Sequence, residues 1–87
     1  MSMPRNKRQY LDVRPILEEG GEPFPVIRKA INVLPEGHVL VLTASFLPSP
    51  LIELLGGEGF SSSVERGEGG DWIVYFWRDS QEAAPLG

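Results

Sequence analysis

The chain has 87 residues, of which 41% are hydrophobic and 23% are charged, an ordinary composition for one small globular domain. It contains no cysteine, which excludes disulfide bonds, thiolate catalysis and cysteine-ligated metals and fits a reducing compartment. No apolar run approaches the roughly 20 residues of a membrane-spanning helix, and the N-terminus lacks the apolar core of a signal peptide. We therefore expect a soluble, cytoplasmic protein without a membrane partner.

The net charge of −4 is distributed unevenly along the chain. Residues 1–8 carry +3, residues 79–87 carry −2, and residues 9–78 between them carry −5. An acidic body repels phosphate backbones, which makes nucleic acid an unfavourable partner. We interpret residues 1–8 as a basic flexible head, residues 9–78 as the folded domain and residues 79–87 as a flexible tail.

The first half of the domain predicts a strand, a helix and a second strand. Alternating polar and apolar residues over 9–13 indicate a strand, which Arg14-Pro15 ends, and a loop follows through Gly21. Proline costs no hydrogen bond in a first helical turn, so Pro23 is the predicted first helical residue, Pro25 the third and Glu22 the cap. The predicted buried stripe of this helix is Val26, Ile27, Ala30, Ile31 and Leu34.

The apolar run 39–42, after the turn at Pro35–Gly37, predicts a central strand with both faces covered at least in part. Ser49-Pro50 is typical of a cap and first turn, so a short second helix should follow and end at Gly56-Gly57. Its predicted packing residues are Leu51, Ile52, Leu54 and Leu55. Residues 60–66 and 72–77 predict two further strands, joined by a flexible glycine-rich hairpin at residues 67–70.

The element order is thus strand, helix, strand, helix, strand, strand. Strands separated by a helix usually run parallel, whereas the last pair closes as an antiparallel hairpin. The predicted fold is an α/β (α+β) two-layer sandwich, in which two helices cover one face of a four-stranded mixed sheet.

Both sides of the last predicted strand are apolar, although only one can face the helices. Trp72, Val74 and Phe76 share one side, and Ile73, Tyr75 and Trp77 share the other. An uncovered aromatic face often marks an interface, so a homodimer through Ile73, Tyr75 and Trp77 is one prediction. The alternative is that the basic head or the C-terminal tail folds back over that face.

Three segments of the chain resemble the TusA/SirA sulfur-carrier superfamily. They are Leu11-Asp12-Val13-Arg14, Glu22-Pro23-Phe24-Pro25-Val26-Ile27-Arg28-Lys29 and Leu34-Pro35-Glu36-Gly37. The chain is closer still to the cysteine-less relatives grouped as domain-of-unknown-function family 2249, whose second helix typically opens with Pro-x-Pro-Leu, as Pro48-Ser49-Pro50-Leu51 does here. The resemblance covers residues 9–78 and implies the same order of elements. It also implies a bacterial or archaeal accessory protein, with relatives associated with hemerythrin-like, redox or respiratory proteins.

One departure from the sulfur carriers decides the chemistry. Their persulfide-carrying cysteine aligns with Glu22, and a carboxylate cannot replace the thiolate nucleophile that accepts and passes on sulfane sulfur. Sulfur transfer by this chain is therefore excluded. What remains is a binding surface, for which we predict Arg14, Glu22, Pro23, Phe24 and Pro25 at the first helix entrance. The second loop, with Phe46, Pro48 and Pro50, and the open sheet face are alternative contact sites.

Other candidate sites carry little chemistry. His38 is the only histidine and follows a turn, so no catalytic triad can be assembled. Glu18, Glu19 and Glu22 lack a recognised cation-binding spacing, and the glycine-rich segments contain acids in place of a phosphate-binding lysine. Arg14 either forms a local salt bridge, to Asp12, Glu18 or Glu19, or holds the entrance loop or an anion at the helix N-terminus. We predict no catalytic residue, no metal site and no cofactor.

The leading functional hypothesis is a non-enzymatic protein-interaction module with a TusA-like fold. The second hypothesis is a small-ligand or metal-binding domain that uses the acidic loop and Arg14 at the first helix entrance. The third is RNA binding, because a related sheet topology occurs in the C-terminal domain of a translation initiation factor; the acidic body disfavours it.

Overall fold

The computed structural model describes residues 7–78. Most of the predicted basic head and the whole predicted tail therefore lie outside the described residues. Lys7 and Arg8, which we assigned to the head, are instead the first two residues of a strand. That strand begins earlier than the alternation pattern indicated because its parallel partner extends back to His38, which pairs with Lys7.

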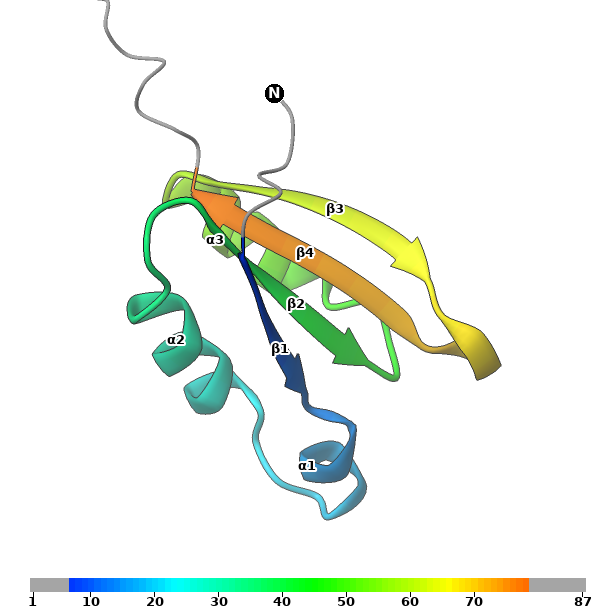
Figure 1. The fold of residues 1–87 in the computed structure, drawn as a ribbon. Coiled ribbons are helices and arrows are strands. Elements are labelled where there is room, and N and C mark those ends of the chain that lie inside the picture. The colour runs from blue at the N-terminus through cyan, green and yellow to red at the C-terminus, as the bar shows by residue number, and fades with distance from the viewer. Residues whose placement is uncertain (1–6, 79–87) are drawn as a thin grey trace, which may run out of the picture.

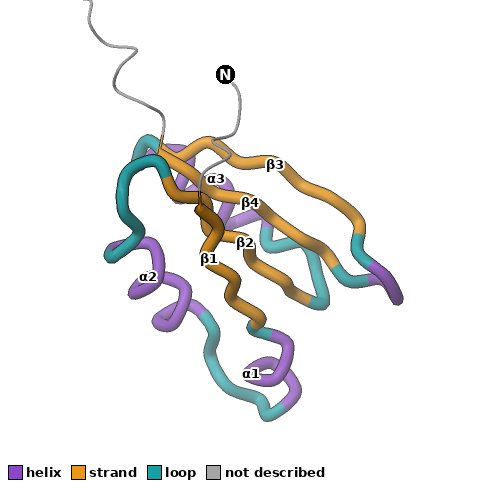
Figure 2. Tube along the Cα trace, viewed as in Figure 1, coloured by secondary structure: helices purple, strands orange, loops and turns teal. Residues whose placement is uncertain are grey.

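The predicted four-stranded mixed sheet and its two covering helices are confirmed (Figures 1 and 2). The elements are β1 (Lys7–Asp12), α1 (Arg14–Glu18), α2 (Phe24–Asn32), β2 (His38–Ala44), α3 (Ser49–Gly57), β3 (Phe60–Arg66), the 3₁₀ turn η1 (Glu68–Gly70) and β4 (Trp72–Arg78). The strand order is β1-β2-β4-β3, with β1 parallel to β2 and β4 antiparallel to both of its neighbours. Because β2 and β3 are both antiparallel to β4, they run in the same direction as β1. They are also the two strands that follow a covering helix.

The main core lies between the sheet and the two covering helices. Ile27 and Ile31 from α2 and Leu51 and Leu55 from α3 pack against Leu40, Leu42, Val74 and Phe76 of the two central strands. Two residues predicted to pack are instead exposed: Val26 by 40% and Leu54 by 45%. Each helix contacts the sheet along one narrow stripe, and these positions lie beside the stripe rather than on it.

The other face of the sheet carries a second apolar cluster. Val39, Val41, Tyr75 and Trp77 are all buried, with Ile73 packed against them. This confirms that the central strand β2 has both faces covered. The Tyr75 hydroxyl donates a 3.0 Å hydrogen bond to Glu65, and burial together with that carboxylate raises the pKa of Tyr75. Whether this face is an interface stays a prediction, and shielding by the head or tail concerns mainly residues outside the described range.

The segment predicted as a break and a loop contains the short helix α1. Pro15 occupies its first turn, where a proline stabilises rather than interrupts a helix. The Leu17 amide donates to the Val13 carbonyl at 3.1 Å, and Ile16 and Leu17 pack against the main core. The helix ends at a left-handed glycine, Gly20, with φ of 77°.

The predicted N-cap of α2 is one residue too early, and the predicted N-cap of α3 is one residue too late. Pro23 is the N-cap of α2, so Glu22 precedes the cap and makes no capping hydrogen bond. Pro48 is the N-cap of α3, and Ser49 is its first helical residue. In each helix the proline carbonyl accepts the first intrahelical bond, from Ile27 and Ile52 at 3.0 Å, and a proline needs no donor of its own at that position.

Candidate functional site

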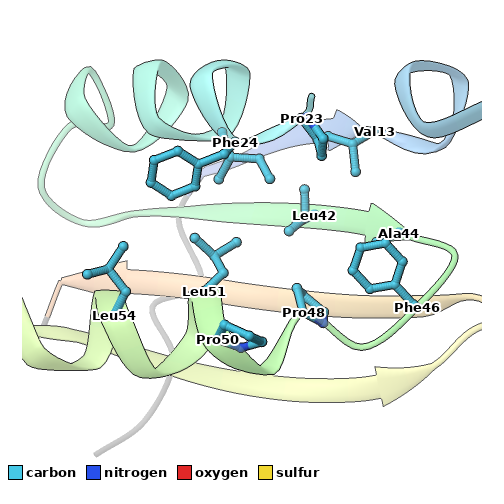
Figure 3. Close-up of a pocket in the computed structure, with 11 residues that line it drawn as sticks. Val13, Pro23, Phe24, Leu42, Ala44, Phe46, Pro48, Pro50, Leu51 and Leu54 are labelled. Atoms are coloured by element: carbon cyan, nitrogen blue, oxygen red, sulfur yellow. The ribbon is translucent and has the colours of Figure 1, made fainter. Parts of the chain in front are cut away.

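An apolar groove lies where the N-terminal ends of α2 and α3 meet above the ends of the central strands. It has a volume of about 270 Å³. Figure 3 shows Phe24 of α2 on one side, Leu51 and Leu54 of α3 on the other, and Leu42 of β2 between them. The complete lining is Val13, Pro23, Phe24, Ile27, Leu42, Ala44, Phe46, Pro48, Pro50, Leu51 and Leu54.

The groove has a rigid floor and an exposed rim. Val13, Ile27, Leu42 and Ala44 in the floor belong to the main core and are buried. The rim residues Phe24, Phe46 and Leu54 are 38%, 50% and 45% exposed. Large apolar side chains kept in water at one place cost free energy, so covering this rim would be favourable.

Two pairs of prolines make the groove poor in hydrogen-bond donors. Each long helix has a proline at its N-cap and another at its second helical position: Pro23 and Pro25 in α2, Pro48 and Pro50 in α3. Proline has no N–H, so half of the amides that would point out of the first turn are missing. The Ser49 amide is also engaged, with the Leu47 carbonyl at 2.9 Å. Both helix ends therefore favour an apolar occupant over an anion.

The structure brings the two predicted binding segments together. Pro23 and Phe24 from the helix entrance and Phe46, Pro48 and Pro50 from the second loop line the same groove. Glu22 and Pro25 are exposed and do not line it. The sheet-face residues Ile73, Tyr75 and Trp77 belong to the cluster on the opposite side of the sheet.

Arg14 also lies outside the groove and is held by two carboxylates. Its guanidinium contacts Asp12 at 2.6 Å and Asp71 at 2.6 Å. The Asp12 pair is the local salt bridge predicted from the sequence, whereas Asp71, directly before β4, is distant in the chain. The side-chain and main-chain hydrogen bonds from Arg14 lower the pKa of Asp12 to about 2, and the two carboxylates raise the pKa of Arg14. This arrangement fixes the end of β1 to the β3–β4 hairpin.

The remaining polar candidates are His38 and the acidic residues just before α2, and none of them lines the groove. The Gln9 side-chain amide donates a 3.2 Å hydrogen bond from Nε2 to His38 Nδ1. Over residues 7–78, no three His, Asp or Glu side chains gather as a metal ion requires, so Glu18, Glu19 and Glu22 do not form a cation site. Within the same residues, no helix has the length and apolar character needed to cross a membrane.

Sequence reasoning missed the floor of the groove and one side of its rim. Val13 and Leu42 fall in predicted strands, and nothing local distinguishes a core residue under a groove from one under a helix. Ala44 lies beyond the predicted strand 39–42, although β2 extends to it. Leu54 could have been found: it lies three residues after Leu51, on the flank of a stripe that Leu51 and Leu55 already fill.

Fold and groove together define a small two-layer α+β domain with an apolar site at its helix entrances. The chain belongs to the family described as "Uncharacterized conserved protein (DUF2249)", which matches residues 10–78. The resemblance to family 2249 is thereby confirmed, while the relation to the sulfur carriers stays a prediction. No curated protein and no solved structure matches the chain.

Proposed function

We propose that the protein is a non-enzymatic interaction module that binds an apolar segment of a partner protein in the groove between α2 and α3. The observation that carries the proposal is the convergence of exposed apolar side chains. Phe24, Phe46 and Leu54 come from three separate stretches of the chain, yet they surround one groove with a buried floor. A partner's apolar side chains would remove this rim from water without requiring any polar partner.

The chemistry of the lining supports binding rather than catalysis. None of the lining side chains can donate, accept or carry a proton, since all are aliphatic, aromatic or proline. General acid–base or nucleophilic catalysis would need a titratable group from the partner. The proposal keeps the cytoplasm as the compartment, because a chain without cysteine is suited to reducing conditions. A redox or respiratory partner is implied only by the resemblance to TusA-like proteins.

The test is affinity capture from a lysate of the source cell with a matched pair of variants. Leu54→Glu places a charge on the groove rim, and Val64→Glu places the same charge on β3 at a site of similar exposure, 45% against 41%. Both variants should keep the wild-type circular dichroism spectrum and melting temperature within a few degrees. We expect wild type and Val64→Glu to retain the same partner and Leu54→Glu to lose it.

Photo-crosslinking then locates the contact. A benzophenone side chain introduced at Phe46 should crosslink to that partner, whereas the same side chain at Val64 should not. If Leu54→Glu retains every protein that wild type retains, the groove is not the binding site and the proposal fails.

A small apolar ligand is the second candidate, because the groove is lined by apolar side chains alone. A space of about 270 Å³ lies just below the range of about 300–1,000 Å³ typical of small-molecule sites. Such a ligand at 100 times its dissociation constant would add roughly 2.7 kcal/mol to the unfolding free energy. A thermal-shift panel of apolar metabolites with wild type and Leu54→Glu distinguishes it: a shift in wild type alone would support the ligand.

A further inference from the structure

Among residues 7–78, the edge strand β1 leaves a row of backbone groups without a strand partner. It pairs with β2 on one side only, because it is the first strand in the order β1-β2-β4-β3. The Val13 amide, just beyond the strand, donates to the Thr43 carbonyl of β2 at 3.0 Å. In a parallel ladder alternate residues direct both backbone groups to the same side, so Gln9 and Leu11 also face β2. The backbone groups of Arg8, Tyr10 and Asp12 therefore face the free edge.

The surroundings of this edge are open. Tyr10 is 73% exposed, the highest value among the large apolar and aromatic side chains of the described residues. A hollow of about 360 Å³ runs beside it, lined by Gln9, Tyr10 and Leu11 of β1 and by Ala30 and Val33 of the α2 side, among others. Figure 1 shows β1 at the margin of the sheet, with α2 drawn to its left in this view. A further strand could therefore add to β1.

The three outward-facing residues are complementary to themselves in one antiparallel register. If two copies of β1 pair about a two-fold axis at Tyr10, Tyr10 lies opposite Tyr10 and Arg8 lies opposite Asp12 of the second copy, twice. Each of these three residue pairs is then a hydrogen-bonded pair, in which the two residues exchange two backbone hydrogen bonds. The opposite charges of Arg8 and Asp12 then face each other across the two strands, which is favourable. The outward-facing residues of β1 have their side chains on the helix-free face of the sheet, because Arg8 and Tyr10 pair with Val39 and Val41 of the second cluster.

We infer that the protein forms a two-fold symmetric dimer through β1, joining two four-stranded sheets into one continuous sheet. The occupant of the edge is a second copy of this chain, selected by the Arg8–Asp12 charge match. The interface is isologous, as a two-fold axis requires. It leaves the groove between α2 and α3 free, so dimerisation would present two grooves to a partner.

The other edge strand offers no comparable match. An antiparallel pair of β3 strands centred on Ser63 would place Arg66 opposite Phe60, and Glu65 opposite Ser61. Charged residues on an edge often serve to prevent pairing. On β1, however, Arg8 and Asp12 have opposite signs and lie symmetrically about the centre of the strand, so a second copy can match them.

Dimerisation replaces or shares contacts that each charged side chain makes within its own chain. The Arg8 guanidinium lies 5.6 Å from the centre of the Tyr75 ring, and Asp12 accepts hydrogen bonds from Arg14. An exposed cation–π contact is weak, and a carboxylate can accept from two guanidinium groups at once. The interface is also short, so we expect a weak dimer rather than an obligate one.

The first test removes the backbone donor at the centre of the proposed interface. Tyr10→Pro deletes an N–H that faces the free edge and bonds nothing in β2, a place where an edge strand tolerates proline. Sedimentation of wild type over a concentration series up to about 1 mM should show a monomer–dimer equilibrium. Tyr10→Pro should raise the dissociation constant by about tenfold or more. Tyr10→Thr, which keeps the N–H and favours a strand, should change it less.

The second test uses the charge match and does not depend on proline. Arg8→Glu alone and Asp12→Arg alone should each weaken the dimer several-fold, because each puts like charges opposite each other. Mixed in equal amounts, the two variants should associate again, since every facing pair in the mixed dimer has opposite signs. A monomeric wild type at all concentrations, an unchanged Tyr10→Pro dimer, or no recovery in the mixture of folded variants would overturn the inference.

Discussion

At the scale of single residues, the best-defined electrostatic feature is Arg14 between Asp12 and Asp71. Asp12 receives the Arg14 main-chain amide at 3.0 Å as well as its guanidinium. These bonds favour the ionised carboxylate, which is why the pKa of Asp12 falls from 3.8 to about 2. Asp71 accepts a hydrogen bond from the other side of the same guanidinium. The Arg14–Asp71 ion pair therefore connects α1 to the β3–β4 hairpin.

The lowered pKa predicts how stability depends on pH. A carboxyl with a depressed folded-state pKa stabilises the fold fully above its unfolded pKa and loses that contribution as pH falls through the folded value. The unfolding free energy of wild type should therefore decline between about pH 4 and about pH 2. The Asp12 part is expected to be at most about 1 kcal/mol, because the pair is partly exposed and screened by solvent.

Urea unfolding at a series of pH values measures this contribution. Asp12→Asn should be less stable than wild type at pH 6 and should converge toward it at pH 2. Glu53→Gln is the control, since Glu53 is exposed on α3 and forms no ion pair among residues 7–78. Parallel pH profiles for wild type and Asp12→Asn would show that the Arg14 contact contributes nothing to stability.

At the scale of elements, the end of α3 contains glycines with opposite roles. Gly56 lies in the last turn of the helix, and a Cβ there would meet nothing within 4 Å. Gly59 follows the helix with φ of +96°, a conformation that only glycine adopts easily, and leads directly into β3. A side chain is thus tolerated at one position and strained at the other.

Two alanine substitutions should therefore shift stability in opposite directions. Gly56→Ala should stabilise the domain by about 0.5–1 kcal/mol, because it restricts the unfolded chain and suits a helix. Gly59→Ala should destabilise it by about 1–2 kcal/mol, the cost of a left-handed residue with a Cβ. Chemical denaturation of both variants under one set of conditions tests the pair; equal signs would mean that the α3–β3 turn is not formed as described.

The elements also show how far sequence patterns reach. The alternation of residues 60–66 predicted β3 with its observed ends, and the unbroken apolar run predicted a central strand with both faces covered at least in part. α1 was missed because Arg14-Pro15 suits both a break and a first helical turn, and only the packing of Ile16 and Leu17 decides between them. The groove could not be predicted as one site, since Phe24 and Phe46 come to line the same groove only through the fold.

At the scale of the whole molecule, the two apolar clusters share strands. Leu40 and Leu42 of β2 point into the helix-side core, and Val39 and Val41 of the same strand point into the second cluster. β4 does the same with Val74 and Phe76 on one face and Tyr75 and Trp77 on the other. A strand cannot leave one cluster and remain in the other, so the domain should unfold as one unit.

This sharing makes a prediction about substitutions on either face of β2. Leu42→Ala, at a fully buried position, should cost about 2–5 kcal/mol, which for a domain of 87 residues corresponds to a fall of roughly 10–30 °C in melting temperature. Val41→Ala removes fewer atoms from the opposite face and should cost less.

In a Trp72→Phe background the fluorescence of Trp77 reports the second cluster alone, while far-UV circular dichroism reports the helices. The two signals should give one coincident transition in both variants, because each substitution weakens a strand that both clusters need. If Leu42→Ala lowered the dichroism midpoint while the Trp77 transition stayed at its wild-type temperature, the second cluster would persist without the helices, and the sheet rather than the sandwich would be the folding unit.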